Sequence, residues 1–173
     1  SELALTDING NFSLSADVTE ALKSSGDFYI QIIPITDGDL RTRNTYAGQV
    51  VTRPTYDKQA DENIDEIFSN VLEEGDYANT NIAITPLTTI KSKMVEDGKT
   101  VALANNAVKA TFNIGDDELN QVDPYSVLEE PDADKRDKAK KVLDRINEVM
   151  TITDSIVAST KNTAIDAANR TKT

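Results

Sequence analysis

The spacing of apolar residues changes its period near Pro54, and this change constrains the fold more than any other feature of the sequence. Before it, apolar residues alternate with polar ones, as at Leu3 and Leu5 and again from Phe12 to Ala16. Such alternation is typical of strands with one buried face. From Asp61 onward, apolar residues recur every three or four positions, which is the period of an amphipathic helix. The sequence therefore predicts a β part followed by a helical part.

Three segments of the β part carry strand or turn signals. Residues Asp7 to Asn11 read D-I-N-G-N, and Asn and Gly accept the backbone angles that a hairpin turn requires. The segment Phe28 to Ile33 is the most β-prone of the chain, and Pro34 ends it because proline cannot donate to a ladder. A further strand is expected from Tyr46 to Thr52.

The helical part has its own start and stop signals. Thr85 before Pro86 is a helix start, Gly98 a stop, Thr100 a second start, and Asp123-Pro124 a brief helical turn. The last and longest helix is expected to begin near Asp132. An earlier helix, closed by Gly75, is indicated by the apolar positions Ile64, Ile67, Phe68, Val71 and Leu72.

These signals predict an α+β fold with three segments. Residues 1–55 form the β-sandwich part and residues 56–160 the helical part packed against it. Residues 161–173 form a polar tail, which frays unless a partner holds it. The first two parts can also form one integrated domain.

Composition excludes several classes of function. The chain has no Cys and no His, which removes disulfides, thiol chemistry and the usual zinc ligands. Its formal net charge of −12 repels phosphate backbones, so we expect no nucleic-acid partner. No apolar run reaches the length of a membrane span, so we expect no membrane insertion.

An enzymatic function is not expected, although a hydrolase that uses paired carboxylates is the alternative. Mutation of a carboxylate pair such as Asp37 and Asp39 would test this alternative, because hydrolysis would then be lost. No glycine-rich phosphate loop, nucleophile elbow or nucleotide fingerprint occurs in the chain. Aromatic residues make up only 5% of it and Trp is absent, so little is available to build a sugar platform.

Acidic and amide side chains at alternating positions are the candidate metal ligands, and calcium is the expected ion. Oxygen ligands at alternating positions can wrap a hard cation. The glutamate expected at the twelfth position of a calcium loop is replaced by Val18, so a hairpin turn held by side-chain hydrogen bonds is the alternative reading. The candidates are Asp7, Asn9, Asn11 and Asp17 in one group, and Asp37 and Asp39 in another.

Two segments resemble a known arrangement when taken together. The segment Glu2 to Leu14 resembles the closing hairpin of carboxypeptidase-regulatory-like and related Ig-like β-sandwich modules of bacterial surface proteins. The segment Asn81 to Ile90, which reads N-I-A-I-T-P-L-T-T-I, resembles the start of the helical region that often follows this hairpin. The downstream order agrees: a small-residue helix from Ala102 to Ala110, the Asp123-Pro124 element, then a long helix.

The resemblance implies a non-catalytic structural or adhesive module of large, calcium-associated extracellular proteins of prokaryotes. In those relatives a strand precedes the hairpin, whereas this chain begins at Ser1, so the expected antiparallel Ig-like sandwich is incomplete. We expect the chain to have been processed or cut from a longer one, or a neighbouring copy to supply the missing strand. The expected partners are therefore neighbouring copies or domains of the same protein. A self-assembling subunit of an extracellular filament or tubule, joined by strand addition, is the alternative.

Overall fold

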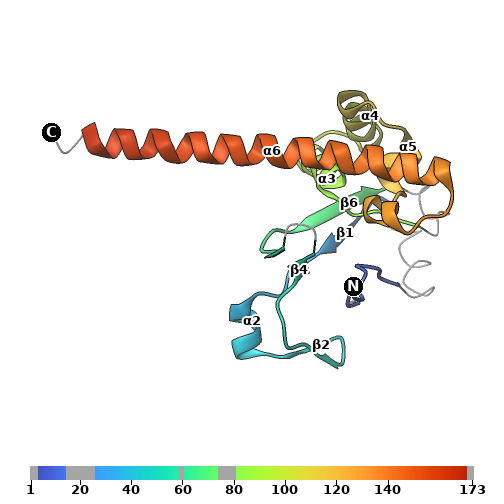
Figure 1. Ribbon diagram of the computed structural model, residues 1–173, viewed down its shortest axis with the longest axis horizontal. Coiled ribbons are helices and arrows are strands. Elements are labelled where there is room, and N and C mark those ends of the chain that lie inside the picture. Colours follow the sequence, from blue (N-terminus) through green and yellow to red (C-terminus); the bar gives the residue numbers. More distant parts are fainter. Residues whose placement is uncertain (1–3, 15–25, 59–60, 74–80, 171–173) are drawn as a thin grey trace.

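The computed structural model describes residues 4–14, 26–58, 61–73 and 81–170 of the chain. Helices α3, α4, α5 and the first half of α6 gather on one side of a small sheet, β1–β6 (Figure 1). Helix α2 and the β2–β3 hairpin lie on the opposite side of that sheet. The mixture of helices and small antiparallel sheets confirms the α+β class.

Each sheet in the described part of the chain has two strands. β1 (Phe28–Ile32) pairs antiparallel with β6 (Phe68–Leu72), with Ile30 opposite Asn70. Within these residues the sheets do not amount to the predicted Ig-like sandwich. β1 comes before residue 55 and β6 after it, so one sheet joins the two parts that the sequence predicted.

The remaining strands form two short hairpins. β2 (Thr45–Tyr46) pairs with β3 (Gln49–Val50), and β4 (Tyr56–Asp57) pairs with β5 (Glu62–Asn63). The single strand predicted from Tyr46 to Thr52 is therefore wrong. Ala47 and Gly48 have φ values of 46° and 75°, and this left-handed pair turns the chain back on itself.

The predicted helix through Ile64 to Leu72 is also wrong, because its second half is strand β6. Three positions of the expected helical stripe, Phe68, Val71 and Leu72, lie in β6, where Ser69 to Leu72 are buried on both faces of the strand. A strand covered on both faces loses its alternation, so its apolar spacing can imitate a helix. Pairing with β1 decides the outcome.

Helices α3 (Pro86–Glu96) and α4 (Val101–Phe112) begin where the sequence predicted. The Thr85 side chain accepts a hydrogen bond from the backbone N–H of Thr88, and the Thr100 side chain accepts one from Leu103. Gly98 follows α3 with a φ of 102°, a conformation that favours glycine. These confirmed boundaries depend on local capping alone.

Three helical elements follow α4, and the last two of them are the predicted Asp123-Pro124 turn and the predicted long helix. They are α5 (Asp116–Asn120), the 3₁₀ helix η2 (Pro124–Leu128) and α6 (Ala133–Arg170). α6 has 38 residues and extends well beyond the rest of the molecule (Figure 1). Its backbone is helical to Arg170, so the helix includes most of the tail predicted to fray.

The main core lies between these helices. It joins α3, α4, α5 and α6 through the buried residues Leu87, Val108, Ile114, Leu119, Val142 and Ile146. Among the described side chains, those that α6 contributes to this core come from its first half.

Candidate functional site

The largest fully buried side chain of the described residues is a lysine, and its surroundings form the first candidate site. Lys91 of α3 is 1% exposed. Its Nζ donates to Asn70 Oδ1 on β6 at 3.0 Å and to Asn120 Oδ1 at the end of α5 at 2.9 Å. Burying an ammonium group is costly unless hydrogen bonds compensate it, and these two carboxamide oxygens do so.

The hydrogen bonds continue beyond Lys91 through side-chain amides. Asn70 Nδ2 donates to the carbonyl oxygen of Ala83 at 3.0 Å. Asn120 Nδ2 donates to Asn105 Oδ1 of α4 at 2.8 Å, and Asn105 Nδ2 donates to the Asp116 carboxylate at 2.6 Å. We call Asn70, Lys91, Asn105, Asp116 and Asn120 the Lys91 network. It links β6, α3, α4 and α5.

Asp116 supplies the negative charge of the Lys91 network. Burial raises the pKa of its carboxyl, but hydrogen bonds from Asn105 and Lys109 and the charge of Lys91 lower it, and the lowering prevails. A lowered folded-state pKa means that the ionised group stabilises the fold above its unfolded value of about 4, and that this stabilisation is lost as the pH falls. The carboxylate is therefore ionised at neutral pH.

The chemistry of the Lys91 network is that of a structural joint. Lys91 can donate but not accept, and the three asparagines neither accept nor release protons near neutral pH. Within the described residues, the hydrogen-bond capacity of these amides is directed at one another and at the backbone. The arrangement fixes how four elements meet.

Of the predicted metal ligands, the structure brings Asp7, Asn9 and Asn11 together in one turn. Asp7 Oδ1 accepts from the backbone N–H groups of Asn9 at 2.8 Å and Asn11 at 2.9 Å. These backbone hydrogen bonds, first from Asn11 and then from Asn9, lower the pKa of Asp7. The Asp7 carboxylate thus closes the turn.

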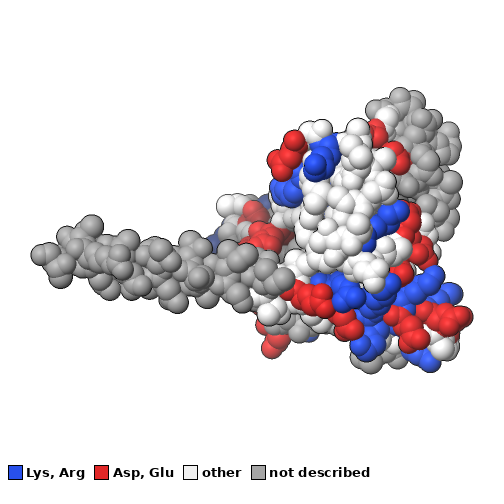
Figure 2. Space-filling view, turned by 90° about the horizontal axis from the view of Figure 1, so that it is seen from above, with Lys and Arg blue, Asp and Glu red and all other residues white. Residues whose placement is uncertain are grey.

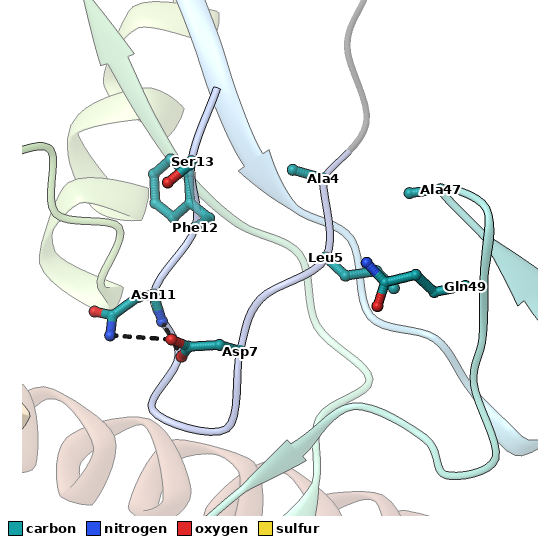
Figure 3. Close-up of a pocket in the computed structure, with 8 residues that line it drawn as sticks. All are labelled: Ala4, Leu5, Asp7, Asn11, Phe12, Ser13, Ala47 and Gln49. Carbon is teal, nitrogen blue, oxygen red and sulfur yellow. Dashed lines mark hydrogen bonds between the residues drawn. The ribbon is translucent and has the colours of Figure 1, made fainter. Parts of the chain in front are cut away.

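A shallow pocket of about 380 Å³ lies between this turn and the β2–β3 hairpin (Figure 3). Asp7 and Asn11 lie on one side of the pocket and Gln49 on the other. The remaining lining residues are Ala4, Leu5, Phe12, Ser13 and Ala47. The Asp7 carboxylate binds the turn itself, as the dashed line to Asn11 shows.

The second predicted pair of ligands belongs to a helix that the sequence did not predict. Asp37 and Asp39 lie in the first turn of α2 (Asp37–Thr42), which we expected to be a loop. Asp39 Oδ2 accepts from the backbone N–H and the hydroxyl of Thr36, each at 2.8 Å, and so completes a capping box. Hydrogen bonds from the Thr36 backbone and side chain lower the pKa of Asp39.

The candidate calcium ligands divide between two places in the fold. Asp17 lies outside the described residues. Among the residues that are described, no group of three or more acidic side chains is close enough to hold a metal ion. Asp7, Asn9 and Asn11 stay the candidate ligands of one turn, and Asp37 and Asp39 those of α2.

The second candidate site is the edge of the β1–β6 sheet. The Ser69 backbone N–H donates to Thr89 Oγ1 at 3.0 Å, and the Ser69 carbonyl oxygen accepts from Thr88 Oγ1 at 2.8 Å. Both groups of Ser69 therefore point away from β1, and the first turn of α3 covers this edge of β6. In the described part of the chain no strand covers the opposite edge, which belongs to β1.

The phase of the ladder identifies the backbone groups on that β1 edge. Antiparallel pairs alternate between hydrogen-bonded and non-hydrogen-bonded. Because Ser69 faces away from β1, its partner Gln31 faces away from β6, and so does Tyr29 two residues earlier. We call the segment Asp27 to Ile33, with the outward-facing groups of its odd-numbered residues, the β1 edge.

Basic residues gather over the first half of α6, where Figure 2 shows them beside acidic ones. Lys138 Nζ lies 2.6 Å from Asp117 Oδ2, and Lys141 Nζ lies 3.2 Å from Glu118 Oε2. Arg145 Nε donates to the Phe112 carbonyl oxygen at 2.8 Å. These cations therefore tie α6 to its neighbours inside the molecule.

The Lys91 network was missed at the level of sequence, although one signal pointed to it. Lys91 follows Leu87 by four positions and precedes Met94 by three, so it shares a helix face with these two apolar residues. A charged residue on an apolar face calls for buried partners. Asn70, Asn105 and Asn120 gave no comparable signal.

Among the described residues, no helix is both long enough and apolar enough to cross a membrane. No family model matches this chain, and neither a curated protein nor a solved structure matches it.

Proposed function

We propose that this chain is a non-catalytic structural or adhesive module of the prokaryotic cell exterior. It pairs the β1 edge with a strand of a neighbouring copy or domain, and calcium assists the assembly. The observation that carries this proposal is the asymmetry of the β1–β6 sheet. The first turn of α3 covers one edge through Ser69, whereas the other edge presents the backbone groups of Tyr29 and Gln31.

An open edge suits this role because strand addition needs unpaired backbone donors and acceptors. The β1 edge carries one charged residue, Asp27, and an exposed apolar one, Ile33, which is 61% exposed. Lysines and inward-pointing charges are the usual protection of an edge, and this segment has none. An added strand would also supply part of the sandwich that the resemblance implies.

Two further features support a structural role over a catalytic one. The polar groups of the Lys91 network form hydrogen bonds that join four elements. The Asp7 carboxylate accepts hydrogen bonds that close a turn, and the Asp39 carboxylate accepts hydrogen bonds that cap α2. An exterior location fits the lack of cysteine, because a stray thiol would oxidise there.

The role takes one of two forms. In the first, the chain is a segment of a large surface protein, and a neighbouring domain supplies the added strand. In the second, it is a self-assembling subunit of a filament or tubule. Light scattering of the purified chain in calcium and in chelator separates them. Growth to very large particles in calcium supports the subunit, and a persistent monomer contradicts it.

Hydrogen exchange in the same samples tests strand addition directly. The backbone amides of Tyr29 and Gln31 exchange quickly in the monomer and become protected on assembly. The amide of Ile30 points into the β1–β6 ladder and serves as the internal control. Assembly that leaves the Tyr29 and Gln31 amides unprotected contradicts the proposal.

A further inference from the structure

The β1 edge has the hydrogen-bonding pattern and the end boundaries that pairing with its own copy requires. Its outward-facing residues are Asp27, Tyr29, Gln31 and Ile33, because Ser69 fixes the phase of the ladder. If two such edges run antiparallel with Ile30 on the two-fold axis, Tyr29 of one copy lies opposite Gln31 of the other. Both residues face outward, so the pair exchanges both N–H···O bonds. The same axis places Asp27 of one copy opposite Ile33 of the other, and this pair also exchanges both N–H···O bonds.

The ends of the β1 edge match under this two-fold pairing. At one end Gly26 has a φ of 82°, which turns the chain out of the strand direction. At the other end Pro34 follows, and the outward groups of Ile35 are already bonded to Thr55 at 2.8 Å. Under the two-fold axis Gly26 of one copy meets Pro34 of the other, so the incoming strand turns away before it reaches Thr55. The segments of β1 that can pair are therefore equally long in the two copies.

Charge favours the antiparallel arrangement of two copies. Asp27 is the single charged residue of the segment and lies at its first position. Antiparallel pairing separates the two Asp27 carboxylates by the length of the strand, whereas parallel pairing brings them together, which is unfavourable. The side chains on the solvent side, Tyr29 at 41% exposed and Gln31, then form cross-strand neighbours.

We infer that two copies of this chain associate through β1–β1 pairing, which forms a continuous four-stranded sheet in the order β6-β1-β1-β6. This inference rests on the proposed function and names the partner as a second copy of this chain. A two-fold contact of this kind closes on itself, so any larger particle needs an additional contact.

A proline substitution tests the pairing without disturbing β6. Gln31→Pro removes an outward-facing N–H, and proline is tolerated where the N–H of an edge strand faces solvent. The matched control, Gln31→Val, keeps the N–H and suits a strand. By analytical ultracentrifugation, we expect dimers for the wild-type chain and for Gln31→Val, and monomers for Gln31→Pro. A cooperative thermal transition for each variant shows that it is folded, and the melting temperature of the monomer can lie below that of the dimers because association stabilises the folded state.

Single cysteines test the register, because the chain has no cysteine of its own. Tyr29→Cys and Gln31→Cys are mixed and oxidised. In the inferred register, their Cα atoms lie about 5.5 Å apart, within the range that a disulfide spans. We expect the mixture to form a cross-link between copies. Val50→Cys, an exposed position on β3, is the control for random oxidation.

Two results overturn the inference: a wild-type chain that stays monomeric at high concentration, or a Gln31→Pro variant that dimerises as the wild type does. A third result separates the inference from the proposed function. In it, particles grow in calcium with protected Tyr29 and Gln31 amides, but the cysteine mixture forms no more cross-links than Val50→Cys does. The two-fold register is then wrong, and the proposed function stands. If neither protection nor growth occurs, the inference and the subunit form of the proposed function both fail.

Discussion

At the scale of single residues, Lys91 shows how carboxamide oxygens help to accommodate a buried charge. Its Nζ lies between the carboxamide oxygens of Asn70 and Asn120, which supply dipoles. The nearest ionised group that the network reaches is Asp116, through Asn105. A lysine here positions two elements at once, since its two acceptors belong to β6 and to α5.

Replacing Lys91 by methionine should lower the free energy of unfolding by about 2–3 kcal/mol. Methionine has a similar length but leaves the Asn70 and Asn120 oxygens without their buried donor, and each orphaned acceptor costs about 1–3 kcal/mol. Part of this loss is offset because no charge is buried any longer. Urea unfolding followed by circular dichroism measures the change.

Lys93→Met is the matched control on the same helix. Its side chain is 67% exposed and its ion pair with Glu96 spans 3.1 Å at the surface. Exposed pairs contribute less than about 1 kcal/mol, so this variant should unfold almost as the wild type does. Equal losses for the two lysines would show that the Lys91 network does not hold the fold together.

The residues that could be predicted are those whose role is local. Thr85 and Thr100 cap helices through contacts three residues away, and both were predicted correctly. The partners of Lys91 lie 21 and 29 positions away in the chain. Only the tertiary fold brings them together, so the sequence could indicate that Lys91 needed partners but not which ones.

At the scale of elements, the joint between α3 and β6 determines which edge of the sheet is open. Thr88 Oγ1 donates to the Ser69 carbonyl oxygen at 2.8 Å and also accepts from the Thr85 N–H at 2.8 Å. One hydroxyl therefore caps the helix and covers the strand edge. Without this joint, both edges of the sheet would present unpaired groups.

Thr88→Val should lower the free energy of unfolding by about 2 kcal/mol. Valine keeps the shape of the side chain but removes the hydroxyl, so the buried Ser69 carbonyl and the Thr85 N–H each lose a partner. Urea unfolding measures the loss. Thr111→Val, at an exposed position of α4, is the control and should change stability by less than about 0.5 kcal/mol. A Thr88→Val variant as stable as this control would contradict the role of the joint.

The two elements that the sequence misassigned were missed for different reasons. β6 has buried residues on both faces, so its apolar positions fit a helical period as well as a strand. α2 has no apolar stripe, and its first turn contains the two aspartates that suggested a cation loop. The contact that decides the structure of β6 is its pairing with β1, and the contact that decides α2 is the Thr36 cap. Neither contact entered the prediction from the sequence.

At the scale of the whole molecule, charge is distributed unevenly. The net charge is −12, yet the first half of α6 carries Lys138 and Lys141, which form ion pairs with Asp117 and Glu118 in the acidic first turn of α5. This contact and the apolar core fix one half of α6 against the body. Within the described side chains of α6, the buried apolar residues are Ala139, Val142 and Ile146, and all three precede residue 150. The other half of α6 extends away from the body (Figure 1).

The fold should therefore depend on the first half of α6 and not on the second. A chain that ends at Thr151 keeps every α6 residue in the core of the described side chains, so its free energy of unfolding should lie within about 1 kcal/mol of the full chain. Its helical circular dichroism signal should fall, because half the length of α6 is removed.

A chain that ends at Lys141 loses Val142 and Ile146 as well. Removing such buried side chains costs several kcal/mol, comparable to the whole stability of a small domain, so this chain should not fold cooperatively. Urea unfolding of the two truncated chains decides the matter: if the chain ending at Thr151 also fails to unfold cooperatively, the distal half of α6 stabilises the body through contacts of its own.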